Sequence, residues 1–296
     1  MRNMWVMALL AAMQILGGAG TAVSKGNMNL QVVVSILPQA YFVERIGGRH
    51  VIVDVLVGPG QSPATYEPTP QQMAMLASAD IYFRIGVPFE RALMGKVPSS
   101  FPRLRMVDTR HGVPLRFFDP DHHSAEVSHR PRQAPDPHIW LDPKRVKIQA
   151  GTICEALKDK VPMRAAVFEA NLERFLAELD AIDDDISRIL SPVHGKDIFV
   201  FHPAFGYFCD SYGLNQIALE VAGKEPTGKH IAALIDMARQ RGADVIFVEP
   251  QFSRKVAEAV ARAIGGRIEI LDPLPRNWAD NIRHMALTIR QALEKQ

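Results

Sequence analysis

Two patterns of apolar positions alternate along the chain: short apolar runs typical of buried strands, and apolar residues at helical spacing. Ahead of residue 110, short apolar runs predict buried strands at Leu30 to Leu37, Val51 to Val57, Asp80 to Ile85 and, as a fourth, Met106 to Asp108. Helices are predicted after the first run, to about Ile46, and at Met73 to Ala79. A repeated strand-then-helix order indicates a parallel sheet wrapped by helices.

The same alternation returns after residue 190. The predicted strands there are Asp197 to Phe201, Gln216 to Leu219, Asp244 to Val248 and Arg267 to Leu271. Residues 143–190, between the two halves, have helical spacing that only Pro162 interrupts, which predicts a long rigid linker helix. We therefore expect an α/β fold of two lobes with a cleft between the carboxyl ends of their sheets. The expected units are 23–142, 143–190 and 191–296.

The first 22 residues have the features of a cleavable signal peptide. Arg2 precedes an apolar run that is short for a membrane span, and Gly20, Thr21 and Ala22 supply the small residues of a cleavage site. No cysteine follows the run, so a lipid anchor is not expected. The prediction is a soluble periplasmic protein, with an uncleaved anchor as the alternative.

The charge distribution bears on possible partners, and the cysteine content bears on disulfide bonding. The net charge is +2, and acidic and basic residues are mixed along the chain, so no basic stripe suggests nucleic acid. Cys154 and Cys209 are the only cysteines, and both lie in predicted helices. Two buried, unpaired thiols are favoured, and a disulfide between them is the alternative.

Three candidate metal ligands lie where a predicted ordered element meets a loop. His138 follows a proline-stiffened turn, His202 ends an apolar strand, and Asp272 directly follows another strand. Two imidazoles and one carboxylate suit zinc, or manganese if more oxygen ligands join. Each residue taken singly has an ordinary alternative, because a histidine can bind a local backbone group and an aspartate before proline can be a turn residue.

The ordered motifs resemble a known family over essentially the whole chain after residue 22. The sequence is similar to the zinc and manganese receptors of bacterial ABC importers. The matching segments are Ser62 to Pro70 (SPATYEPTP) with Ala79-Asp80, Asp136 to Pro143, Phe201 to Phe208, Glu225-Pro226, Val248 to Pro250 and Leu271 to Leu274. The resemblance implies a non-enzymatic, monomeric receptor that binds one metal ion between two lobes and delivers it to a membrane permease. It also implies that the ligands correspond to His138, His202 and Asp272.

The sequence departs from the family at the first ligand. The family usually has histidine directly after the proline of the first loop, where this chain has Ala64, and a methyl group cannot bind a metal. Glu67 on the same loop is one possible replacement. The segment 119–129 offers others, and its histidines are His122, His123 and His129. That segment is equally well explained as a solvated loop.

Alternative functions stay open at this point. A zinc-dependent hydrolase would also use three protein ligands and an open position, with Glu67 or Glu249 as its general base. A receptor paralogue with altered metal preference, or with lost metal binding, is the other class. Zinc is favoured over manganese because two of the three expected ligands are imidazoles and because the segment 119–129 is a histidine-containing loop.

Overall fold

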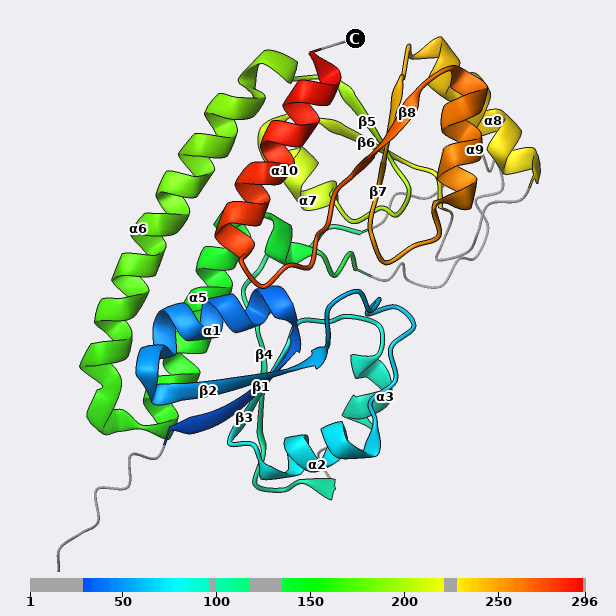
Figure 1. Ribbon diagram of the computed structural model, residues 1–296. Helices are drawn as coiled ribbons and strands as arrows, with labels where there is room; N and C mark the ends of the chain where they lie inside the picture. Colours follow the sequence, from blue (N-terminus) through cyan, green and yellow to red (C-terminus); the bar gives the residue numbers. More distant parts are fainter. Residues whose placement is uncertain (1–28, 96–99, 118–134, 221–227, 295–296) are drawn as a thin grey trace, which may run out of the picture.

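The computed structural model describes residues 29–95, 100–117, 135–220 and 228–294 (Figure 1). The predicted signal peptide, the histidines of segment 119–129 and the motif Glu225-Pro226 lie outside these residues.

The first half of the chain builds a four-stranded parallel sheet in the order β2-β1-β3-β4. Its strands are β1 (Leu30–Ile36), β2 (Val51–Val57), β3 (Ile81–Arg84) and β4 (Arg105–Asp108). Its helices are α1 (Leu37–Gly47), α2 (Pro70–Ser78) and α3 (Glu90–Met94). The apolar runs form strands because both faces of the sheet are covered, which leaves β1 and β3 almost fully buried.

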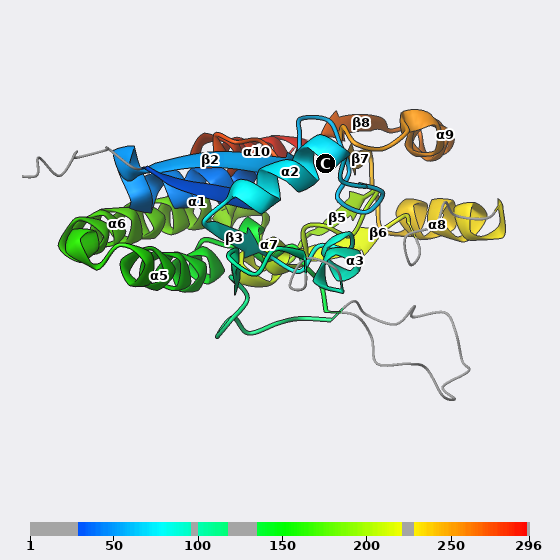
Figure 2. The same ribbon diagram turned by 90° about the horizontal axis from the view of Figure 1, so that it is seen from below.

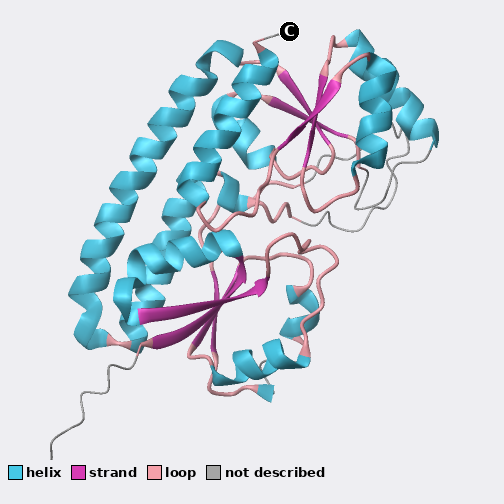
Figure 3. Cartoon of the chain, in the orientation of Figure 1, coloured by secondary structure: helices cyan, strands magenta, loops and turns pink. Residues whose placement is uncertain are grey.

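The second half repeats this topology in the order β6-β5-β7-β8, again with parallel pairs only (Figure 3). Its strands are β5 (Asp197–Val200), β6 (Asn215–Ala218), β7 (Val245–Val248) and β8 (Arg267–Ile270). Its helices are α7 (Gly206–Tyr212), α8 (Gly228–Gln240), α9 (Arg254–Ile264) and α10 (Trp278–Leu293). The predicted fold class of two α/β lobes is confirmed. The division at residues 142 and 190 stays a prediction.

The predicted linker is two helices that lie side by side, α5 (Pro143–Lys160) and α6 (Ala165–Leu190) (Figures 1 and 2). The break falls at the short 3₁₀ turn Pro162–Arg164, because proline has no N–H to continue the α-helical bonding. Helix α6 has 26 residues and is therefore about 39 Å long. It packs against α1 of the first lobe and α10 of the second, so it braces both.

Three local features bear on the sequence: the start of α5, the two cysteines and the apolar character of the helices. The carboxylate of Asp142 caps α5 by accepting from the backbone N–H of Lys144 at 2.9 Å. Cys154 and Cys209 are free and buried, as favoured, and burial raises the pKa of the Cys154 thiol to about 11. Among the residues described, no helix combines the length and the apolar character that a membrane crossing requires.

Candidate metal site

The structure brings the two predicted histidine ligands together. His138 precedes the 3₁₀ turn Ile139–Leu141, and His202 lies two residues beyond the end of β5. Their ring centroids are 5.2 Å apart and the ring planes are inclined by 73°. The ring of Phe252 stacks on His202 at 4.9 Å and restricts its orientation. One imidazole from each half of the chain therefore reaches the same place.

Each imidazole is held at Nδ1 by a buried carboxylate. His138 Nδ1 lies 2.7 Å from Asp136 Oδ1, and His202 Nδ1 lies 2.6 Å from Glu220 Oε2. A carboxylate accepts the Nδ1 proton, so this pairing puts the lone pair of each neutral ring on Nε2. Carboxylates that orient metal-binding histidines in this way are common in zinc sites. No sequence pattern pointed to a role for Asp136 or Glu220.

The surroundings of His138 favour its neutral form. Burial lowers the pKa of His138, and the neighbouring carboxylate of Asp136 opposes this shift only in part. Only the neutral imidazole has a lone pair for a metal ion. The site therefore holds His138 in the form that coordination requires.

An ionisable side chain follows every strand of the second sheet at its carboxyl edge. His202 follows β5, Glu220 follows β6, Glu249 follows β7 and Asp272 follows β8, each within two residues of the strand end. This regularity could have been read from the sequence once the four strands were placed. Parallel strands put these four side chains on one edge, where ligands bind in open α/β sheets.

Glu249 is the least solvated member of this edge. It is 1% exposed, and Oε2 accepts a 3.3 Å hydrogen bond from the backbone N–H of His202. Its Oε1 atom is buried and has no hydrogen-bond partner among the described residues. Burial raises the pKa of Glu249 well above its usual range. An incompletely bonded acid at this edge fits a site that accepts a cation.

Asp272 is held by its own turn and by a neighbouring side chain. Its Oδ1 atom accepts from the backbone N–H of Leu274 at 3.0 Å and from Gln251 Nε2 at 2.8 Å. Over the described ranges, no three or more His, Cys, Asp or Glu side chains are grouped so that they could hold a metal ion. The two histidine rings are adjacent, but Asp272 is not grouped with them. A three-ligand site that includes Asp272 therefore requires side-chain movement.

The other proposed ligands lie elsewhere or outside the description. Ala64 and Glu67 are exposed on the loop before α2, and within the described ranges Glu67 joins no group of three or more His, Cys, Asp or Glu side chains that could hold a metal ion. Tyr66, between them, is buried against Phe89 with ring centroids 4.7 Å apart. The histidines of segment 119–129 fall outside the described residues.

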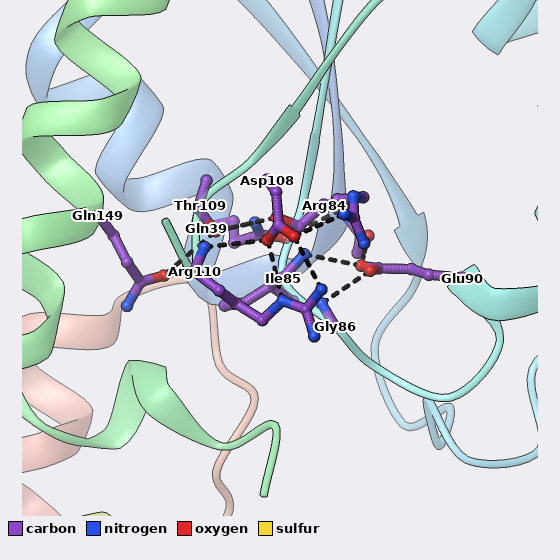
Figure 4. Close-up of polar contacts among 10 residues, drawn as sticks. Gln39, Arg84, Ile85, Gly86, Glu90, Asp108, Thr109, Arg110 and Gln149 are labelled. Carbon is purple, nitrogen blue, oxygen red and sulfur yellow. Dashed lines mark hydrogen bonds and ion pairs between the residues drawn. The ribbon is translucent and has the colours of Figure 1, made fainter. Parts of the chain in front are cut away.

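A polar network lies at the carboxyl edge of the first sheet (Figure 4). The buried carboxylate of Glu90 accepts from the backbone N–H groups of Ile85 and Gly86 at 2.8 and 2.7 Å, which closes the turn after β3. Asp108 forms ion pairs with Arg84 at 2.5 Å and with Arg110 at 2.7 Å. These contacts fold the turns after β3 and β4 against each other.

The same network reaches the His138 turn through three amide and hydroxyl side chains. Gln39 Nε2 donates to the Phe83 carbonyl at 3.3 Å, and Thr109 Oγ1 donates to the Arg84 carbonyl at 3.0 Å. Gln149 Nε2 donates to the carbonyl of Ile139, the residue after His138, at 3.4 Å. The turn that presents His138 is therefore anchored to the first sheet and to α5.

Helix α7 anchors this turn from the second lobe. The Tyr207 hydroxyl accepts from the backbone N–H of Arg116 at 2.8 Å and donates to the Asp136 carbonyl at 3.0 Å. The guanidinium of Arg145 lies over the Tyr207 ring at 4.5 Å. Because α7 begins shortly after His202, Tyr207 ties the two histidine-bearing segments together.

Comparison with known proteins agrees with this architecture. A family model described as "Zinc-uptake complex component A periplasmic" matches residues 32–292. The chain belongs to this family. The resemblance inferred from the sequence motifs is thereby confirmed.

Two relatives carry the name "High-affinity zinc uptake system protein ZnuA". The protein of Bacillus subtilis (strain 168) is 30% identical over 267 residues, which cover 86% of this chain and 81% of that protein. The protein of Yersinia pestis is 29% identical over 301 residues, which cover 92% and 91%. A crystal structure of ZnuA superposes with a TM-score of 0.83 at 39% identity and covers 89% of this chain and 99% of that one.

Proposed function

We propose that this protein is a periplasmic receptor that binds Zn²⁺ and delivers it to the permease subunits of an ABC importer. The observation that carries the proposal is the pair His138 and His202, one from each lobe, with each Nδ1 atom held by a buried carboxylate. The family match and the names of the relatives support the same function.

The proposed ligands are Nε2 of His138, Nε2 of His202 and the carboxylate of Asp272. Three protein ligands and one further position occupied by water are common in exchangeable zinc sites. Asp272 would leave Gln251 to join the two histidines. Glu67, His122, His123 and His129 are alternative sources for the position that Ala64 leaves open. Imidazole ligands favour Zn²⁺ over Mn²⁺, which is the alternative cargo.

We also propose that residues 1–22 are removed on export and that the receptor is a monomer. A family described as periplasmic is consistent with both the signal peptide and this location. The zinc-hydrolase alternative gains no support, because the matching family is a component of zinc uptake.

The test is a chelator-competition titration of the exported, metal-stripped protein with Zn²⁺ and, separately, with Mn²⁺. We expect one tight Zn²⁺ site per chain and its loss in His138→Ala and His202→Ala. His284→Ala is the matched control, because His284 is an exposed histidine on α10. The proposal fails if Zn²⁺ does not bind at one equivalent, or if the first two variants bind it as tightly as the control.

A further inference from the structure

A second candidate site lies at the amino edge of the first sheet, away from the histidine pair. An open cavity of about 510 Å³ is lined by Arg49, His50, Arg164 and Val167. Arg49 and His50 directly precede β2, while Arg164 and Val167 belong to the start of α6. Figure 1 shows the start of α6 beside the amino ends of β1 and β2. Two segments more than a hundred residues apart in the sequence thus form one pocket.

The charge of this cavity is not balanced. Two guanidinium groups and one imidazole line it, and no carboxylate does. Across the described parts of the chain, neither Arg49 nor Arg164 forms a side-chain hydrogen bond or an ion pair. Most other arginines have a carboxylate partner, as Arg45 and Arg105 do. The positive charges at this corner are therefore available to a ligand.

His50 adds a polar atom that lacks a partner. Its Nδ1 atom is buried, and no described residue hydrogen-bonds to it. The ring is fixed against Phe168 of α6 with centroids 6.2 Å apart and an interplanar angle of 75°. His50 lines the cavity while its Nδ1 atom is buried, so Nε2 is the ring nitrogen that a ligand in the cavity can reach.

Helix α6 adds to the positive potential. Its N-cap residue, Arg164, makes no side-chain capping hydrogen bond, and its first turn contains Val167, which lines the cavity. The amino end of a helix carries a partial positive charge and N–H donors, which favour an anion. Guanidinium groups match the oxygen atoms of phosphate in geometry and charge.

We propose that Arg49, His50 and Arg164 form a binding site for a phosphate-class oxyanion. The guanidinium groups of Arg49 and Arg164 contact its oxygen atoms, and His50 donates from Nε2. The phosphate group is either a free ion or part of a lipid headgroup. This site is separate from the proposed metal site and does not depend on it.

The test measures the binding of inorganic phosphate to the exported, metal-stripped protein by isothermal titration calorimetry. Sodium chloride is adjusted to keep the ionic strength constant. The test variant is Arg49→Gln/Arg164→Gln. The matched control is Arg91→Gln/Arg254→Gln, which removes the same two charges from exposed arginines on α3 and α9. A second arm measures co-sedimentation with phosphatidylglycerol vesicles and with phosphatidylcholine vesicles.

We expect one phosphate per chain, with affinity at least about tenfold weaker in the test variant and unchanged in the control. Co-sedimentation with phosphatidylglycerol alone, lost in the test variant, would assign the same phosphate chemistry to a lipid. If neither phosphate nor vesicles bind, or if the control variant loses as much binding as the test variant, the proposal is wrong. Circular dichroism of both variants verifies the fold.

Discussion

The indole N–H of Trp140 donates a 2.7 Å hydrogen bond to the carbonyl of Pro273, 133 residues later. Trp140 lies two residues after His138, and Pro273 directly follows Asp272. Trp278 Nε1 in turn donates to the Trp140 carbonyl at 2.7 Å, and both indoles are 1% exposed. These buried bonds join the turn that presents His138 to the turn that presents Asp272, and none of the three proposed metal ligands takes part in them.

Trp140→Phe should weaken both stability and zinc binding. The substitution keeps an aromatic ring but leaves the buried carbonyl of Pro273 without its donor, which typically costs about 1–3 kcal/mol. We expect a lower midpoint of urea unfolding in the presence of chelator and a larger dissociation constant for Zn²⁺. Unchanged zinc affinity in a destabilised variant would show that this bond does not position the site.

Asp136→Asn and Glu220→Gln should each reduce zinc affinity about 10- to 100-fold, because the loss of an orienting carboxylate typically has this effect. An amide can donate to Nδ1 and so favour the wrong tautomer of the ring. Chelator competition measures the change. Asp159→Asn is the control, because the Asp159 side chain is exposed on α5, and we expect it to leave zinc affinity unchanged. Equal affinity in all three variants would contradict the proposed orientation of the rings.

Tyr207→Phe separates positioning from general stability. The variant loses the hydroxyl that contacts Asp136 and Arg116, whereas Tyr212→Phe loses a hydroxyl that donates to Asp183 on α6. Each loss should destabilise the fold by about 1 kcal/mol. Only Tyr207→Phe should weaken zinc binding, since only Tyr207 contacts the His138 turn. If both variants bind zinc equally well, Tyr207 has no positioning role.

The lowered pKa of His138 predicts how stability changes with pH. In the unfolded chain His138 takes up a proton near pH 6.5, whereas in the folded chain burial delays this to lower pH. The unfolded state therefore binds more protons between the two pKa values, and the free energy of unfolding falls as pH drops below about 6.5. Urea unfolding with chelator at pH 7.5, 6.5 and 5.5 measures this, and His138→Gln should show a smaller decline. An equal decline in the variant would contradict the lowered pKa.

The apolar patterns determined most of the secondary structure. Val51 to Val57 was predicted as a strand and forms β2 with the same bounds, because its β-branched and apolar residues favour a strand even though Ile52 and Asp54 are exposed at the edge of the sheet. The N-cap of α5 at Asp142 has a similarly local cause, because an aspartate directly before a proline is a common start of a helix. Helix α3 was not predicted, since its five residues are too few to show a helical period.

Only the tertiary structure decided the arrangement of the site. The pairing of His202 with Glu220, the contact between the two imidazole rings and the link from Trp140 to Pro273 all join residues that no local pattern relates. The family resemblance named His138, His202 and Asp272, but it did not show that Asp272 is held by Gln251. Local periodicity reports which face of an element is buried, whereas the packing of α1 and α10, one helix from each lobe, against α6 decides which strand ends meet.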